Sequence, residues 1–168
     1  VHEKMRAVVA HTLGIPVARV HVESTSTLRV ANLSPTAAST GADLNGAAAR
    51  QACLTVQAGL RALAARELDC AEDAVRFADG KIMAEQSART LDWEALVTEA
   101  YVQRIPLSAL AHYATPGLHF DRNTNQGTPF TYHVYGVAMV ESTVDTLRGT
   151  ARIDRVSVVH DVGHSIDE

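Results

Sequence analysis

An alanine-rich helical pattern over about residues 44–67 constrains this sequence more than any other feature. Asp43 directly precedes the pattern, and its side chain is predicted to cap the helix N-terminus. The many alanines favour the helical state and allow close packing against a neighbouring element. Apolar residues recur along one face with the spacing of an α-helix, at Leu44, Ala48, Ala52, Val56, Leu60 and Leu63.

Shorter helix and strand patterns accompany this segment. Helices are expected over about 5–13, where Gly14 stops the helix, and over about 93–101, where Asp92 caps it. Together these patterns predict an α+β fold, with helices packed on a mixed, largely antiparallel sheet. Strands are expected at 20–22, 75–77, 82–83, 107–113, 130–144 and 150–160, with a hairpin turn at Asp79-Gly80.

The two longest strand patterns lie near the end of the chain. Residues 130–144 are apolar on both faces, which is typical of a central strand. Gly149 stands where the following turn needs a left-handed residue, so residues 150–160 are expected to return as the antiparallel partner. A polar loop is predicted over residues 121–129, before the first of these strands.

Composition and charge narrow the function classes. The chain has 168 residues, of which 46% are hydrophobic and 20% charged, and a net charge of −4 without a basic tract. This disfavours nucleic acid and an anionic membrane surface as partners. Two cysteines, Cys53 and Cys70, cannot build a disulfide framework or a zinc site alone, so reduced thiols in a cytoplasmic protein are expected. The histidines show no paired metal-ligand spacing.

A loop of small residues, 32–43, runs directly into the long helix and is the segment most suited to chemistry. Amides at a helix start lack internal partners, and the helix dipole adds positive character there, so anionic groups suit this place. Small side chains also let a large ligand approach the backbone, while Ser34, Thr36, Ser39 and Thr40 offer hydroxyl donors. The same composition is typical of an ordinary capped loop, and both interpretations remain open on composition alone.

The order of residues in this loop resembles a known family. Residues 32–46, which read NLSPTAASTGADLNG, resemble the Ser-Pro-Thr-Ala-Ala-Ser…Asp-Leu-Asn-Gly segment of xanthine dehydrogenases. Further resemblances follow in the same order along nearly the whole chain. They lie at residues 13–16 (LGIP), 112–116 (HYATP), 126–130 (QGTPF), 135–136 (YG), 144–149 (VDTLRG) and 160–163 (HDVG).

The resemblance implies a part of a molybdopterin-binding domain of the xanthine dehydrogenase and aldehyde oxidase family. Such enzymes hydroxylate purines, other heterocycles or aldehydes with oxygen from water, and a molybdenum cofactor carries the chemistry. The resemblance further implies that the backbone at Ala37 and Ala38 approaches the metal centre most closely, and that Thr36 and Ser39 offer hydrogen bonds to the pterin or its phosphate side. The implied cofactor-binding set is Thr36, Ala37, Ala38, Ser39 and Gly41.

The resemblance also implies that residues 1–168 are one segment of this domain, truncated at both ends. The family's general base and further cofactor and substrate contacts would lie outside it, so the chain alone is expected to be inactive and to contain no catalytic residue. Iron–sulfur clusters and FAD are expected in other domains or subunits, and the parent is expected to be an oligomer. The alternatives are a non-catalytic interaction or dimerisation domain of the same fold and an unrelated α+β hydrolase, for which no nucleophile with an ordered base can be placed.

Overall fold

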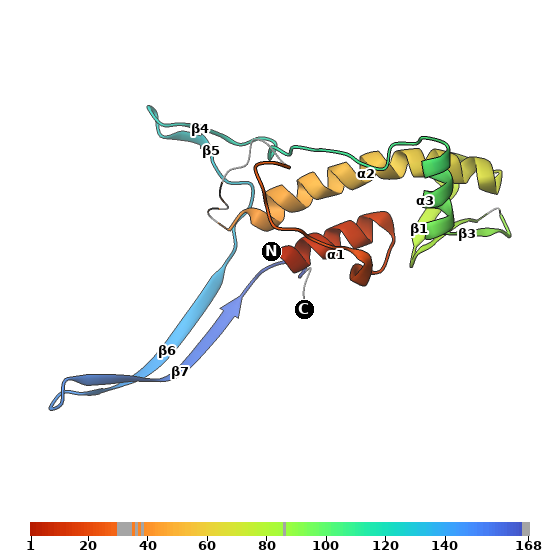
Figure 1. Ribbon diagram of the computed structural model, residues 1–168. Helices are drawn as coiled ribbons and strands as arrows, with labels where there is room; N and C mark the ends of the chain where they lie inside the picture. The colour runs from red at the N-terminus through yellow and green to blue at the C-terminus, as the bar shows by residue number, and fades with distance from the viewer. Residues whose placement is uncertain (30–34, 36, 38, 86, 166–168) are drawn as a thin grey trace. The chain divides into compact units, whose positions relative to one another are not determined.

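The computed structural model describes residues 1–29, 35, 37, 39–85 and 87–165, and it confirms the α+β class (Figure 1). The chain divides into two compact units, of which the first is Val1–Ala114 and the second begins at Thr115. All strand pairs found in the described ranges are antiparallel, and they form three separate small sheets. Among the helices of these ranges, none is long and apolar enough to cross a lipid bilayer.

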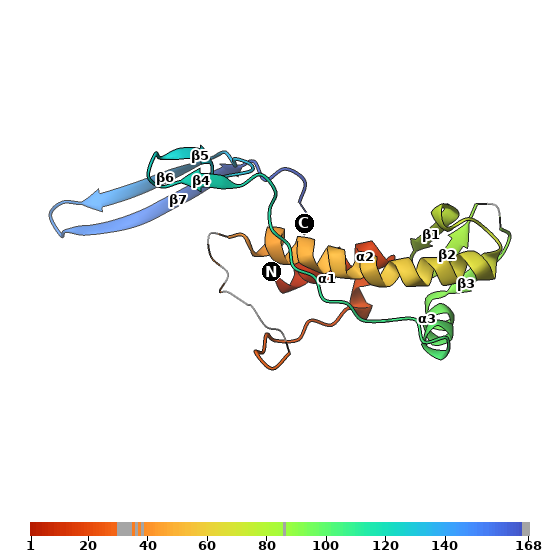
Figure 2. The same cartoon turned by 90° about the horizontal axis from the view of Figure 1, so that it is seen from above.

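Two helices form the long axis of the first unit. Helix α1, His2–Leu13, lies alongside the first half of helix α2, Gly41–Leu68, in both views (Figures 1 and 2). Gln57 joins them: its buried side-chain amide donates to the Thr12 carbonyl at 2.7 Å. Near the end of α1 that carbonyl lacks a complete set of helical partners, so the bond from α2 stabilises the helix terminus.

A small three-stranded sheet and a third helix pack on the far half of α2. Strands β1 (Val75–Ala78), β2 (Lys81–Ala84) and β3 (Thr90–Asp92) pair in sequence order, followed by α3 (Trp93–Val102). Short 3-10 helices, η1 (Val17–Arg19) and η2 (Glu72–Ala74), complete the connections. The core of this unit is the fully buried set Leu60, Leu63, Val75 and Ile82, surrounded by Ala64, Leu68, Leu96 and Ala100.

The second unit consists of two hairpins. Strands β4 (His119–Asp121) and β5 (Gln126–Thr128) form the first, and β6 (Gly136–Asp145) and β7 (Thr150–His160) form the second. The predicted return of residues 150–160 against the preceding strand is therefore confirmed. Gly149 has a φ of 67°, as the turn prediction requires.

Several element predictions were wrong, and strand pairing explains them. Residues 20–22 and 107–113 have no regular secondary structure. An extended segment becomes a strand only where another strand accepts its backbone bonds, and the Val20 carbonyl instead accepts a bond from the Arg6 side chain. The predicted polar loop at 121–129 contains parts of β4 and β5. The strand expected from residue 130 begins at Gly136, and β7 is its single neighbour in the described residues.

Both helix caps differ in detail from their predictions. The prediction that Asp43 caps the long helix is wrong: α2 begins at Gly41 with Thr40 as its N-cap, so Asp43 lies within the first turn. Gly41 and Ala42 extend the helix upstream, and the Thr40 carbonyl accepts the Leu44 amide at 2.9 Å. Asp92 is the N-cap residue of α3 as predicted, but its carboxylate pairs with the Lys81 ammonium and makes no capping bond.

Candidate functional site

The small-residue loop ends in a tight turn against the start of α2. The carbonyl oxygen of Ala37 accepts two bonds from Thr40, one from its amide at 3.2 Å and one from its hydroxyl at 2.9 Å. Between them Ser39 has a left-handed backbone with φ 58°, which is uncommon for a residue with a side chain. The turn therefore holds the backbone in a defined shape immediately before the helix.

This turn presents the N-terminus of a long helix. Gly41 is the first residue of α2 and is buried, whereas Ala37 and Ser39 are exposed. The first amides of a helix have no acceptor within it, and the helix dipole gives this end a partial positive charge. Amide donors, a hydroxyl at Ser39 and small side chains form a donor set that fits a large ligand with anionic or carbonyl groups.

The structure brings three of the five predicted site residues together, namely Ala37, Ser39 and Gly41. Thr36 and Ala38 lie outside the described residues, so their roles stay predictions. Sequence reasoning did not include Thr40 in the cofactor-binding set, although its bonds to Ala37 define the turn. A threonine directly before a helical Gly-Ala-Asp start was the signal for it, because Thr is among the favoured N-cap residues.

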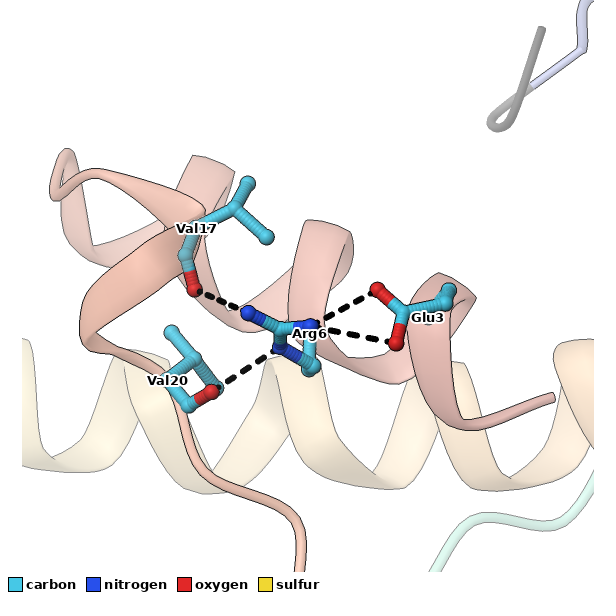
Figure 3. Close-up of polar contacts among 4 residues, drawn as sticks. All are labelled: Glu3, Arg6, Val17 and Val20. Carbon is cyan, nitrogen blue, oxygen red and sulfur yellow. Dashed lines mark hydrogen bonds and ion pairs between the residues drawn. The ribbon is translucent and has the colours of Figure 1, made fainter.

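Arg6 anchors the chain upstream of the loop and was also missed (Figure 3). Its guanidinium donates to the Val20 carbonyl at 3.0 Å, to the Val17 carbonyl at 3.1 Å and to the Glu3 carboxylate at 2.9 Å. Downstream of the loop, Gly46 of α2 packs against α1: a Cβ there would lie 3.4 Å from the Met5 methyl carbon. Helix α1 therefore holds the chain on both sides of the loop, and no short-range pattern marked Arg6 for this role.

Replacing Arg6 by Met should lower the free energy of unfolding by about 1–2 kcal/mol, because the carbonyls of Val17 and Val20 lose a charged donor. The control is Glu3→Gln, which keeps both carbonyl bonds and weakens only an exposed ion pair worth at most ~0.5 kcal/mol. Urea unfolding of the two variants is the measurement. Equal losses would show that the ion pair, and not the bonds to the backbone, accounts for the contribution of Arg6.

An apolar pocket of about 420 Å³ lies elsewhere in the first unit. Leu13, Cys53, Val56, Trp93 and Leu107 are among the residues that line it, and no charged side chain takes part in its wall. Burial raises the pKa of the Cys53 thiol, so the thiol stays protonated near neutral pH and is a poor nucleophile. The pocket can bury apolar groups, but it does not provide an acid, a base or an activated nucleophile.

Comparison with known sequences gives matches along the whole chain. Xanthine dehydrogenase/oxidase of Rattus norvegicus is 37% identical over 166 residues, which make up 99% of this chain and 11% of that protein. Xanthine dehydrogenase of Oryza sativa subsp. japonica is 37% identical with the same coverage. Aldehyde oxidase 2 of Cavia porcellus is 35% identical over 167 residues. The chain thus spans about a ninth of the length of these relatives.

The fold has a counterpart among solved structures. Quinoline 2-oxidoreductase from Pseudomonas putida 86 superposes with a TM-score of 0.73 at 21% identity, over 98% of this chain and 20% of that one. The family model of the molybdopterin cofactor-binding domain matches residues 1–168. With small side chains and amide donors gathered at the start of α2, and with a family match from the first residue to the last, this chain belongs to the molybdopterin cofactor-binding domain family.

Proposed function

We propose that this chain is one segment of a molybdenum hydroxylase and supplies one wall of its molybdopterin site. The observation that carries the proposal is the turn at residues 37–40, which ends in the buried Gly41 at the N-terminus of α2. When bound, the cofactor supplies the redox chemistry that places an oxygen from water on the substrate. The chain's own residues bind and orient that group and leave space beside it.

Each residue of the wall has a distinct part in this proposal. Ser39 donates a hydrogen bond to the pterin or its phosphate side, as does Thr36. Ala37 and Ala38 keep side-chain volume low where substrate and cofactor meet. Gly41 allows close approach of the backbone to the ligand, and the bonds from Thr40 to the Ala37 carbonyl hold the turn in shape. No residue of the chain is assigned a catalytic role.

The parent protein extends beyond this wall in the same proposal. Its substrate is a purine, a related heterocycle or an aldehyde, which the names of the rat, rice and guinea pig relatives support. Iron–sulfur clusters and FAD lie in other domains or subunits, and the assembled enzyme is an oligomer. A place in the cytoplasm, and in purine metabolism, agrees with the two free cysteines and with the xanthine dehydrogenase relatives.

Ser39→Gly in the parent protein tests the proposed cofactor contact. Glycine adopts the left-handed backbone of residue 39 without strain, so the substitution removes the hydroxyl while the turn keeps its shape. Loss of one hydrogen bond should weaken cofactor binding roughly two- to tenfold. The measurement is molybdenum per polypeptide, by elemental analysis, after extended dialysis.

Asp79→Gly is the matched control. Asp79 also has a left-handed backbone, with φ 49°, but it lies in the turn between β1 and β2. The control variant should retain as much molybdenum as the wild-type protein. Equal retention by Ser39→Gly, Asp79→Gly and the wild type would contradict the role of Ser39 and would favour a non-catalytic interaction domain if the wild-type protein also held no molybdenum.

A further inference from the structure

The β6–β7 hairpin has two halves of different character. We call residues 137–140 and 156–159 its apolar half, which contains no charged side chain. Residues 142–145 and 150–153 form its tip half. A register shift between Glu141 and Ser142, with the Glu141–Arg155 ion pair beside it, separates them.

The apolar half is apolar on both of its faces. Residues directly opposite each other in an antiparallel pair share a face. One face therefore carries Val137, Val159 and Met139 with Ser157, and the other carries Ala138, Val158, Val140 and Val156. Each of the valines and the methionine is more than half exposed in this chain. Such a pattern is typical of strands buried on both faces.

The tip half differs, because it has one polar face. Thr143 lies opposite Arg152, and Asp145 lies opposite Thr150, while Val144 and Ile153 belong to the other face. The polar side chains bond among themselves: the Thr143 hydroxyl and the Arg152 guanidinium both donate to Asp154. The tip half can therefore face water on one side, and the apolar half cannot do so without exposing large side chains to solvent.

The edges of the apolar half are equally unsuited to water. In the described residues β6 and β7 pair only with each other, so each has one open edge. Natural edge strands are usually protected from unwanted pairing by charges, prolines or bulges, and none lies within the apolar half. A two-stranded ribbon is also only marginally stable by itself.

We propose that the apolar half of β6–β7 is the central strand pair of a larger sheet, which other segments of the same parent polypeptide complete at both edges and cover on both faces. The proposal rests on the proposed function only in taking this chain as a segment of a longer protein, about a ninth of its relatives' length. A second copy of the chain is a poorer occupant. A symmetric pair would join the same edge of each copy and leave the other edge open.

Backbone hydrogen bonding defines which amides report on the edges. The Asp161 amide donates to the Tyr135 carbonyl at 2.8 Å, so these residues form a hydrogen-bonded pair. Such pairs alternate along an antiparallel ladder. The amides of Val137 and Val159 therefore point into the ribbon, whereas those of Ala138 and Val140 point out from the β6 edge and those of Val156 and Val158 from the β7 edge.

Residue-resolved hydrogen exchange on the purified parent protein tests the proposal. The four outward amides should exchange within about tenfold of the inward amides of Val137 and Val159. Exchange at either edge as fast as in an unstructured peptide would overturn the proposal. Protection that falls when the parent is diluted would assign that edge to a second copy, which also overturns it.

A pair of substitutions tests the faces. Val140→Lys places a charge on a face of the apolar half and should lower the melting midpoint of the parent, whereas Thr150→Lys on the polar face of the tip half should leave it unchanged. Equal midpoints would show that this face is open to water. Molybdenum content measured on the same samples keeps the two proposals apart, since protected edges without molybdenum would contradict only the cofactor site.

Discussion

Ala37→Leu in the parent protein is expected to lower kcat/KM by at least about tenfold, equivalent to ~1.4 kcal/mol of transition-state stabilisation, with an unchanged melting midpoint. Ala37 is exposed in this chain, so a larger side chain meets no packed core here. Its carbonyl bonds to Thr40 use only the backbone and survive the substitution. In the proposed site the added volume occupies space that substrate needs beside the cofactor.

A matched substitution separates volume at the site from volume in general. Ala95 is an exposed alanine within α3, and Ala95→Leu should leave kcat/KM unchanged. Steady-state kinetics, melting and molybdenum content are measured for both variants. Full activity of Ala37→Leu would contradict the placement of this loop beside the substrate. Activity that falls only in proportion to unfolded protein would instead indicate a packing role for residue 37.

Gly14→Ala is expected to have the largest effect on stability among single substitutions outside the core. Gly14 ends α1 with φ 67°, a backbone that costs a residue with a side chain roughly 1–2 kcal/mol. A Cβ there would also lie 2.4 Å from the carbonyl carbon and oxygen of Phe77, which are backbone atoms of β1. Relief requires α1 to move away from β1, so the total loss should exceed the conformational cost alone.

Gly80→Ala supplies the comparison. Gly80 has a similar φ of 74°, but the nearest atom to an added Cβ is the Pro16 Cδ at 3.8 Å. This variant should lose only the conformational roughly 1–2 kcal/mol. Urea unfolding of both proteins gives the difference, which measures the collision at Gly14. Equal losses would show that α1 and β1 separate at little cost.

Local signals were enough to predict the helices and the two principal hairpins. The helical spacing of residues 5–13, with Gly14 after it, predicted α1 together with its left-handed end. Asp79-Gly80 predicted the turn between β1 and β2. Such signals act over a few residues, because helix bonds and two-residue turns join positions close in sequence.

The candidate site was predictable in identity but not in shape. The order of residues 32–46 indicated the family, and residues 37, 39 and 41 do meet at the start of α2. The start of α2 itself was placed too late, at Asp43. Helix ends depend on which residue makes the first bonds, and here the turn from Ala37 to Thr40 brings the helix forward to Gly41.

The sequence by itself determined the class of fold, the family and the small-residue loop, since these depend on periodicity and on the order of neighbouring residues. Tertiary structure decided which extended segments became strands. Residues 107–113 have a strand-like pattern without a partner, whereas β6 has β7 opposite it. It also decided that Arg6 and Gly14 matter, because their partners, Val20 and Phe77, lie 14 and 63 positions further along the chain. Contacts over such separations form only when the chain has folded, and no local pattern encodes them.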